Sequence, residues 1–413
     1  MMKNIRSKMR LKVAALATIS GVSALSGAEH SPLGGHSEKH GSLEQNGVSL
    51  GGEAIYEYSS VLDGGLRRSG SGRGLFVLDL EIDMEQWLSV KGGTLFAHYL
   101  NVTRERGGSA DAGDIQAYSN MESEYALHSL YEIWYQQELM NDRLRIKVGK
   151  VDANTEFAYV DAAGNFANSS AGFSPTLFTF PTYPDPSMSV NVFATAVQTD
   201  RHTVTVGYGL YDGAGAVDGF RLGTRGPATF FSNEESNDYF QIAQAAWAWE
   251  SCGWLGAGLG GRMSVGGWHH NGEFTRFNGS TKEGAHGFFM TLEQQLTMGA
   301  GGDKNGVYAF GQYAWADEDV SEIAQHFSVG LVTQGTLPNR QHDSAGIYLS
   351  HVDLSDDPAA GFTENETVID AFYRVQLTSQ FYVQPELQYI MNPSDDSSVD
   401  DALVGGVRFA LSF

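Results

Sequence analysis

Apolar and polar residues alternate with a period of two in many short segments of this chain. Successive side chains of a β-strand point to opposite faces, so this alternation indicates strands with one apolar and one polar face. The clearest example is GLFVLDLEIDM at 74–84. Its apolar face carries Phe76, Leu78, Leu80 and Ile82, and its polar face carries Asp79, Glu81 and Asp83. The last segment, 401–413, ends the same way with Val407, Phe409, Leu411 and Phe413 on one face.

Sixteen segments of this kind follow one another, and no segment requires a helix. An even number of strands is typical of bacterial single-chain membrane barrels. The predicted strands are 48–60, 74–84, 94–102, 124–139, 143–150, 188–198, 202–211, 239–250, 253–263, 287–296, 307–316, 322–332, 344–352, 366–377, 381–391 and 401–413.

The predicted connections alternate in length, which is a second and independent signal. Connections such as 140–142, 199–201 and 378–380 are short, whereas 103–123 and 151–187 are long. Short turns at one end and long loops at the other are typical of an outer-membrane barrel. Connection 317–321 is an exception, because it is short where a long loop is expected.

Composition supports a barrel over a helical membrane protein. Glycine accounts for 50 of 413 residues, and no stretch after residue 30 approaches the roughly 20 apolar residues of a spanning helix. Unpaired backbone groups are costly in hydrocarbon, so a sheet can cross a bilayer only if it closes on itself. We therefore predict an all-β fold: a transmembrane antiparallel β-barrel of about 16 strands, with the apolar faces toward lipid and the sheet closed between its first and last strands.

The N-terminus has the pattern of an export signal. The first twelve residues contain five Lys and Arg residues, the short apolar run LKVAALATISGVSAL begins at residue 11, and Ser26-Gly27-Ala28 provides a small-residue cleavage site. We expect a signal peptide at 1–28, a flexible lead-in at 29–47 and the barrel domain at 48–413. Irregularly spaced His30, His36 and His40 fit a polar tail better than a metal site.

Charge and cysteine content narrow the function classes. Removing the five basic residues of the signal takes the formal charge from −23 to −28, which argues against a nucleic-acid partner. Cys252 is the only cysteine, so no intramolecular disulfide can form. No nucleophile elbow, HExxH or P-loop motif is present, and we expect neither catalysis nor a cofactor nor a metal.

Connection 151–187 is the longest, and it is too rich in aromatic residues for a solvated loop. We expect it to fold into the barrel and narrow the pore, because barrels of this width otherwise enclose an open aqueous channel. An external cap is the alternative.

Strand parity gives a candidate lining for the pore. Acidic residues of the first two strands and a basic row on the fifth would set a transverse field, and paired charges can hydrogen-bond sugar hydroxyls. The alternative is that these charges only solvate the channel. The candidate substrate-binding residues are Arg143, Arg145, Lys147, Asp79, Glu81, Asp83, Glu132, Trp134 and Arg374. Further lining residues are Glu53, Glu57, Arg262, Asp370, Glu386, Gln388 and Arg408.

Eight segments in a consistent order resemble the carbohydrate-selective porin family (OprB-like), over roughly residues 48–413. Among them are LDLEIDMEQW at 78–87, RIKVGKVDANTEFA at 145–158, LPNRQHDSAGIYLS at 337–350 and GGVRFALSF at 405–413. The resemblance implies a sixteen-stranded porin of the Gram-negative outer membrane, trimeric or monomeric, with an inward loop. It also implies passive diffusion of monosaccharides such as glucose, with charged groups, including arginine, contacting the sugar.

Two other functions remain open on the residues alone. The acidic balance also fits a general, weakly cation-preferring diffusion porin. A barrel that acts mainly as an adhesin or structural protein is the third reading. Expected partners are sugars, outer-membrane lipid and the barrel-assembly machinery, which terminal Phe413 would engage.

Overall fold

Strands dominate the computed structural model, and each pairs with its neighbours along the chain. The structure describes residues 43–103, 108–123, 126–213, 215–216, 238–250, 259–299, 302–363, 365–393 and 398–413. The N-terminal export signal and most of the predicted lead-in therefore lie outside the described residues. Within them, no helix combines the length and apolar character needed to cross a bilayer.

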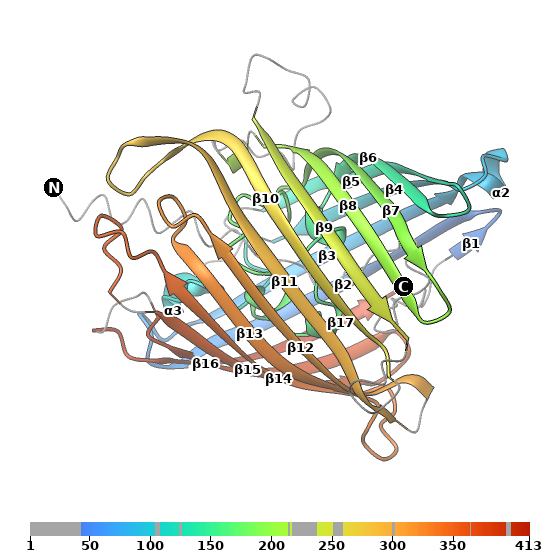
Figure 1. Cartoon of the computed structure of the whole chain (residues 1–413). Helices are drawn as coiled ribbons and strands as arrows, with labels where there is room; N and C mark the ends of the chain where they lie inside the picture. The colour runs from blue at the N-terminus through green and yellow to red at the C-terminus, as the bar shows by residue number, and fades with distance from the viewer. Residues whose placement is uncertain are drawn as a thin grey trace.

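Sixteen antiparallel strands, β2 to β17, form a closed ring (Figure 1). Each pairs with the next, and β17 pairs back with β2 through a register that sets Arg408 opposite Glu57. The predicted closed barrel is confirmed. The strands are β2 (Val48–Asp63), β3 (Gly70–Asp83), β4 (Gly93–Val102), β5 (Leu127–Leu139), β6 (Leu144–Val151), β7 (Ser187–Gln198), β8 (His202–Asp212), β9 (Tyr239–Trp249), β10 (Gly261–Thr275), β11 (Thr281–Gly299), β12 (Gly302–Ala316), β13 (Ile323–Gln334), β14 (Ser344–Leu354), β15 (Glu366–Gln376), β16 (Phe381–Met391) and β17 (Ala402–Ser412).

The outer face of the ring is apolar. On β17, Phe409 and Leu411 are exposed, while Arg408 and Ala410 between and beside them are buried inside. In lipid these outward side chains meet hydrocarbon rather than water, as the alternation predicts. Other exposed apolar side chains on the barrel strands include Tyr56, Tyr58, Phe76, Leu130, Val148, Trp247, Val265, Met290, Leu292, Phe327, Val329, Ile347 and Leu387.

One strand prediction was wrong. The ninth strand was expected at 253–263 with a long loop at 264–286, but β10 runs over Gly261–Thr275 and a short connection, 276–280, joins it to β11. β10 pairs with β11 from Gly261 to Thr275 with a register shift between His270 and Glu273. The expected turn at Ser251-Cys252 lies outside the described residues.

The lead-in also differs from the expectation at its end. A three-residue strand, β1 (Leu43–Gln45), pairs with the start of β2, where Gln45 lies opposite Val48. This added strand is not part of the ring of sixteen.

Two long connections, both joined to the loop end of the barrel, carry short helices. Loop 2, the connection 103–126 between β4 and β5, contains α3 (Ser109–Ala112). Loop 3, the connection 152–186 between β6 and β7, contains η1 (Ala153–Thr155), η2 (Asp161–Ala163) and α4 (Ser169–Gly172). At the opposite, turn end, α2 (Met84–Leu88) joins β3 to β4 (Figure 1).

Candidate functional site: the loop-filled interior of the barrel

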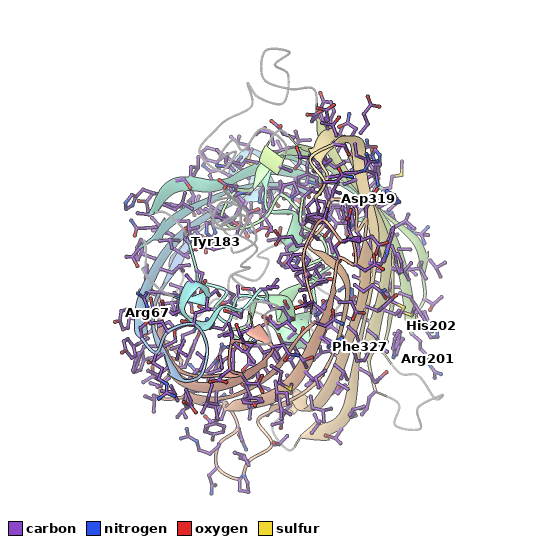
Figure 2. All side chains as sticks on the ribbon, turned by 90° about the vertical axis from the view of Figure 1, so that its left-hand side faces the viewer. Arg67, Tyr183, Arg201, His202, Asp319 and Phe327 are labelled. Atoms are coloured by element: carbon purple, nitrogen blue, oxygen red, sulfur yellow. The ribbon has the colours of Figure 1, made fainter. Side chains whose placement is uncertain are left out.

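Loop 3 folds into the barrel and packs against walls on different sides of the ring. Phe157 stacks against Phe193 of β7 with ring centroids 5.0 Å apart, and Phe166 lies 4.8 Å from Tyr348 of β14. Both loop side chains are fully buried. Seen from the loop end in Figure 2, Tyr183, near the end of loop 3, lies inside the ring of strands. The predicted inward fold of this loop is confirmed.

Wall carboxylates hold the loop by accepting hydrogen bonds from its backbone N–H groups. A buried, irregular segment needs such acceptors, because its N–H groups have no ladder partner. The three acceptors come from strands far apart around the ring, so the loop is fixed at several points. The pairs are Glu132 of β5 with Asp152 (2.9 Å), Glu293 of β11 with Ala162 (2.8 Å) and Glu386 of β16 with Ala167 (2.6 Å).

A charged cluster joins the start of loop 3 to β6. Glu156 forms an ion pair with Arg145 at 2.7 Å and accepts a hydrogen bond from Lys147 Nζ. Each cation also lies over an aromatic ring: Arg145 is 4.2 Å from the centroid of Phe193, and Lys147 is 3.8 Å from that of Trp134. Burial alone would raise the pKa of Glu156, but Arg145 and Lys147 lower it to about 2. Glu156 is therefore charged at neutral pH.

Only one cation of this cluster remains accessible. The Arg145 side chain is 22 % exposed, whereas Lys147 and Glu156 are each 1 % exposed. Arg145 also donates to Gln136 Oε1 at 3.1 Å, which orients its guanidinium along the wall. Arg145 is the group that a solute in the lumen can reach.

A second mixed cluster lies where loop 3 crosses β10 and β11. The Arg262 guanidinium is 3.9 Å from the ring centroid of Tyr159, and its Nη1 lies 3.9 Å from Glu293 Oε1. Glu293 uses its other oxygen, Oε2, to accept the Ala162 N–H. Arg262 and Glu293 are directly opposite each other in the β10–β11 ladder.

Loop 2 is also folded inward, which the sequence analysis did not predict. Arg73 of β3 donates to Glu57 of β2 at 3.0 Å and to Glu122 of loop 2 at 3.1 Å. Arg408 of β17 donates to Glu57 Oε2 at 2.9 Å through Nε, and its Nη2 donates to Asn120 at 2.7 Å. Loop 2 is thus joined to three neighbouring strands.

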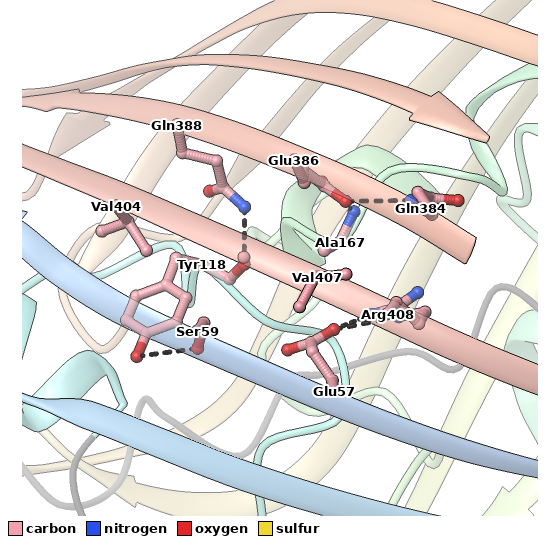
Figure 3. Close-up of a pocket in the computed structure, with 11 residues that line it drawn as sticks. Glu57, Ser59, Tyr118, Ala167, Gln384, Glu386, Gln388, Val404, Val407 and Arg408 are labelled. Atoms are coloured by element: carbon pink, nitrogen blue, oxygen red, sulfur yellow. Dashed lines mark hydrogen bonds and ion pairs between the residues drawn. The ribbon is translucent and has the colours of Figure 1, made fainter. Parts of the chain in front are cut away.

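A small polar pocket remains between the two loops and the wall formed by β2, β16 and β17 (Figure 3). In Figure 3 Gln388 donates to the carbonyl oxygen of Tyr118, a bond of 2.7 Å, and the Glu57–Arg408 pair crosses from β2 to β17. The loops also contact each other: Asn120 N–H donates to the Ala167 carbonyl at 2.6 Å. Loops 2 and 3 therefore form one hydrogen-bonded insert.

The structure places seven of the nine predicted site residues on the inner face of the barrel. The inner face holds Arg145, Lys147, Asp79, Glu81, Glu132, Trp134 and Arg374. Three of these are buried and already engaged: Lys147 by Glu156, Glu132 by the Asp152 N–H, and Trp134 by Lys147 and by Phe96, whose ring lies 4.9 Å away. These three residues hold the wall and loop 3 together, and they are not exposed to a solute in the lumen.

Arg374 and Asp79 are half-buried inner residues with their own partners. Arg374 donates to Gln384 at 2.9 Å and lies 3.9 Å from the Tyr382 ring centroid. Asp79 lies 2.8 Å from His98 Nδ1.

Two predicted residues are not at the constriction. Arg143 lies in the turn between β5 and β6 and is exposed, because the strand begins one residue later at Leu144. Asp83 ends β3 and caps α2, where its Oδ1 accepts the N–H groups of Glu85 (2.9 Å) and Gln86 (3.1 Å). The alternation along each strand assigns both side chains to the inner face. It does not show that Arg143 lies before the start of β6 and that Asp83 lies at the end of β3.

The expected transverse field is also corrected. The acidic residues of β2 and β3 do not face β6 across the ring, since only β4 and β5 separate β3 from β6. The basic residues of β6, Arg145 and Lys147, instead pair inside the barrel with Glu156 of loop 3.

Sequence reasoning missed Glu156 and Arg73. Arg73 was assigned to a loop because its outward neighbours, Gly72 and Gly74, carry no apolar side chain. Tyr56 of the neighbouring strand β2 covers this outer face, since its hydroxyl oxygen would lie 2.8 Å from a Cβ at Gly72. Glu156 and Tyr159 lie in loop 3, which is not a strand. No alternation of inward and outward side chains therefore predicts where they point.

Comparison with known proteins agrees with this architecture. The model of the family described as "Carbohydrate-selective porin, OprB family" matches residues 67–413. This chain belongs to that family. It is therefore a porin of the Gram-negative outer membrane, a non-enzymatic channel.

The relatives of this OprB-family porin are distant in sequence. It is 21 % identical to Porin B of Pseudomonas aeruginosa over 434 residues, covering 92 % of this chain and 91 % of that protein. The structure titled "High pH structure of Pseudomonas putida OprB" superposes with a TM-score of 0.76 at 18 % identity, covering 89 % of this chain and 94 % of that one. OmpF of Salmonella typhi has a TM-score of 0.53 at 11 % identity, covering 90 % and 100 %.

Proposed function

We propose that this porin passes small neutral sugars, monosaccharides such as glucose, by passive diffusion. The observation that supports this most directly is Arg145, whose guanidinium is held over Phe193 and beside Glu156 while staying accessible. A guanidinium offers several N–H donors in a fixed plane, which suits the hydroxyl oxygens of a sugar. Glu156 compensates one of the two positive charges, and a neutral solute carries no charge for the remaining one to repel.

The two inward loops support the same proposal. Loop 3 reduces the free width of a sixteen-stranded barrel, so that a solute must pass along polar side chains rather than through open water. The loop–wall contacts along this route are hydrogen bonds, ion pairs and ring contacts, which suit the reversible passage of a polar solute. The proposed transport is downhill and uncoupled.

The test is planar-bilayer conductance of the refolded porin, titrated with glucose and then with a disaccharide. Saturable block of the ion current by glucose supports a sugar site. Arg145→Met is expected to weaken that block, whereas Arg201→Met, which removes an exposed arginine from the turn between β7 and β8, serves as the matched control for charge. Full conductance without sugar block would contradict the proposal.

A second candidate is a general porin with weak cation preference. It is favoured by the half-buried acids Glu53, Asp79 and Glu81 on the inner faces of β2 and β3. Fixed negative charge along a pore enriches cations. A cation-selective reversal potential in a salt gradient, combined with no sugar block, would favour this function.

The oligomeric state stays a prediction, as does recognition of the C-terminal strand by the assembly machinery. A homotrimer and a monomer are both compatible with the proposed transport, since the polar interior lies within a single chain.

A further inference from the structure

We propose that α2 (Met84–Leu88) and the residues directly after it form an interfacial anchor, which inserts Trp87, Leu88 and Val90 into the phospholipid leaflet at the turn end of the barrel. The turns of such barrels lie on the periplasmic side. In Figure 1, α2 projects from the turn end. The anchor lies outside the pore, so this inference goes beyond the proposed function and does not depend on which solute passes.

The helix is amphipathic although it is short. Met84, Trp87 and Leu88 occupy positions i, i+3 and i+4, which share one side of a helix. Gln86 lies on the other side and faces the turn between β1 and β2, since its Cβ would lie 2.6 Å from a Cβ at Gly47. The polar side of α2 therefore contacts the chain, and its apolar side faces away.

The apolar side is largely uncovered by the part of the chain that the structure describes. Trp87 is 51 % exposed and Leu88 is 57 % exposed, and no residue of the helix is buried. Polar contacts hold the helix instead: Asp83 caps its first turn, and the Ser89 N–H donates to the Glu85 carbonyl at 3.0 Å. The chain thus fixes the direction of two large apolar side chains without burying them, which is unfavourable in water.

Contacts at Gly93 show on which side of the wall the anchor lies. Gly93 and the exposed Tyr99 are an even number of positions apart on β4, so both belong to its outer face. A Cβ at Gly93 would lie 2.9 Å from the Tyr135 hydroxyl oxygen, 3.0 Å from Met84 Cβ and 3.2 Å from Val90 Cγ1. Met84 and Val90 therefore pack on the outer side of the wall, and the anchor continues the apolar belt that contacts lipid.

The chemistry of the anchor selects a lipid surface. A tryptophan ring is favoured at the boundary between headgroups and acyl chains, because its body is apolar and its N–H reaches water. Leu139 and Met140, just beyond the residues of β5 that pair with β4, are also exposed. Lys91 is the only base between residues 83 and 91, so the anchor binds by burying apolar area and not by attraction to anionic lipid.

The test is spin labelling of the porin refolded into phosphatidylcholine vesicles. Because Cys252 is the only cysteine, Leu88→Cys in a Cys252→Ser background carries a single nitroxide. Its collisions with oxygen, which dissolves in lipid, and with a nickel chelate, which stays in water, measure its depth. The matched labels are Val148→Cys, on the outer face of β6, and Asp200→Cys, in the turn between β7 and β8.

The ratio of oxygen collisions to nickel collisions at residue 88 is expected to be severalfold higher than at residue 200 and close to that at residue 148. The ratio should stay the same when the salt concentration rises from about 0.1 M to about 1 M, since charge does not hold the anchor. Heat-modifiable mobility on gels verifies that each labelled barrel has assembled.

Tryptophan fluorescence gives a second readout that needs no cysteine. The difference in emission between the wild type and Trp87→Phe isolates the signal of Trp87. Lipid with brominated acyl chains is expected to quench this signal more strongly than acrylamide, which quenches from water.

Each outcome decides the inference. A label that oxygen reaches and nickel does not, with quenching of Trp87 by brominated lipid, supports the anchor. A label as accessible to nickel as that at residue 200 overturns it, since α2 then lies in water. A label that neither reagent reaches also overturns it, because a second copy of the chain then covers the helix. Absence of glucose block in the wild-type channel overturns the proposed function alone.

Discussion

At the scale of single residues, Glu156 joins loop 3 to the charged side chains of β6. Its carboxylate pairs with two cations of the wall, Arg145 and Lys147, and all three charges depend on one another. Removing one member of a buried charge group leaves the others uncompensated, which costs far more than the group contributes as a whole.

Glu156→Gln is expected to release the start of loop 3 and leave Arg145 and Lys147 without their acid. Sugar block should weaken, and current noise should rise as the loop moves. Glu318→Gln, which removes an exposed acid from the connection between β12 and β13, is the control. Quiet channels with normal sugar block in Glu156→Gln would contradict this role.

The pKa of Glu156 gives this contact a defined pH window. Because the folded pKa of about 2 lies below the ordinary value of about 4.3, the stabilisation is complete above pH ~4.3 and is lost as the pH falls through about 2. The difference corresponds to roughly 3 kcal/mol. Wild-type current should thus stay quiet from pH 7 to pH 4, whereas Glu156→Gln should be noisy over that whole range. Noise in the wild-type channel already at pH 5 would contradict this.

At the scale of elements, the fit between loop 3 and the wall depends on small residues of the strands. Gly346 of β14 leaves room for Phe166, because a Cβ there would lie 2.7 Å from the Phe166 ring and 2.6 Å from that of Phe372. Interiors are close-packed, so an added side chain must displace a neighbour.

Gly346→Val is therefore expected to push Phe166 off the wall and raise the open conductance. Gly267→Val is the matched control, since the nearest atom to an added Cβ at Gly267 is 3.6 Å away. Single-channel conductance measures the effect. Equal conductance in both variants would show that loop 3 is held by its backbone hydrogen bonds alone.

The elements that the sequence predicts well are those that cross the membrane. Alternation works for β3 and β17 because their outer faces meet hydrocarbon and their inner faces carry mainly polar or small side chains. It fails for β10, whose inner face carries Trp268 packed on Phe178 of loop 3, and whose outer residue His269 is polar. Where a loop fills the barrel, the inner face becomes apolar and the period-two signal disappears.

The same reasoning explains how much of the site was predicted. Arg145 and Arg374 follow from strand parity, because the direction of a strand side chain depends only on its position. The contacts between the loops and the wall do not follow from strand parity. Glu386 and Ala167, for example, are far apart in sequence, and the closed ring brings them together. The position of a residue along a strand predicts whether its side chain points inward, but it does not predict which inward side chains the loops cover.

At the scale of the whole molecule, closure depends on the pairing of β17 with β2. Phe413 and Gly52 exchange two backbone hydrogen bonds of 2.9 and 3.0 Å, and the Phe413 ring stacks on Phe76 of β3 at 6.0 Å. These contacts extend the ladder to the last residue and cover the end of the sheet.

Deletion of Phe413 is expected to slow refolding into lipid vesicles and lower the yield of assembled barrel, because both hydrogen bonds and the ring contact are lost. Heat-modifiable mobility measured over time gives the rate. Phe413→Tyr keeps the ring and the backbone and should behave like the wild type. Equal rates for the deletion and the wild type would mean that closure does not depend on the terminal residue.

The junction between the first and last barrel strands is also bridged from inside. Glu57 of β2 binds Arg408 of β17, while Ser119 of loop 2 donates to Glu57 and Asn120 accepts from Arg408. Loop 2 follows β4, and β17 closes the ring of sixteen against β2. The contacts of loop 2 and the pairing of β17 with β2 therefore stabilise the same seam, so a loop 2 that leaves the interior also weakens the closure of the barrel.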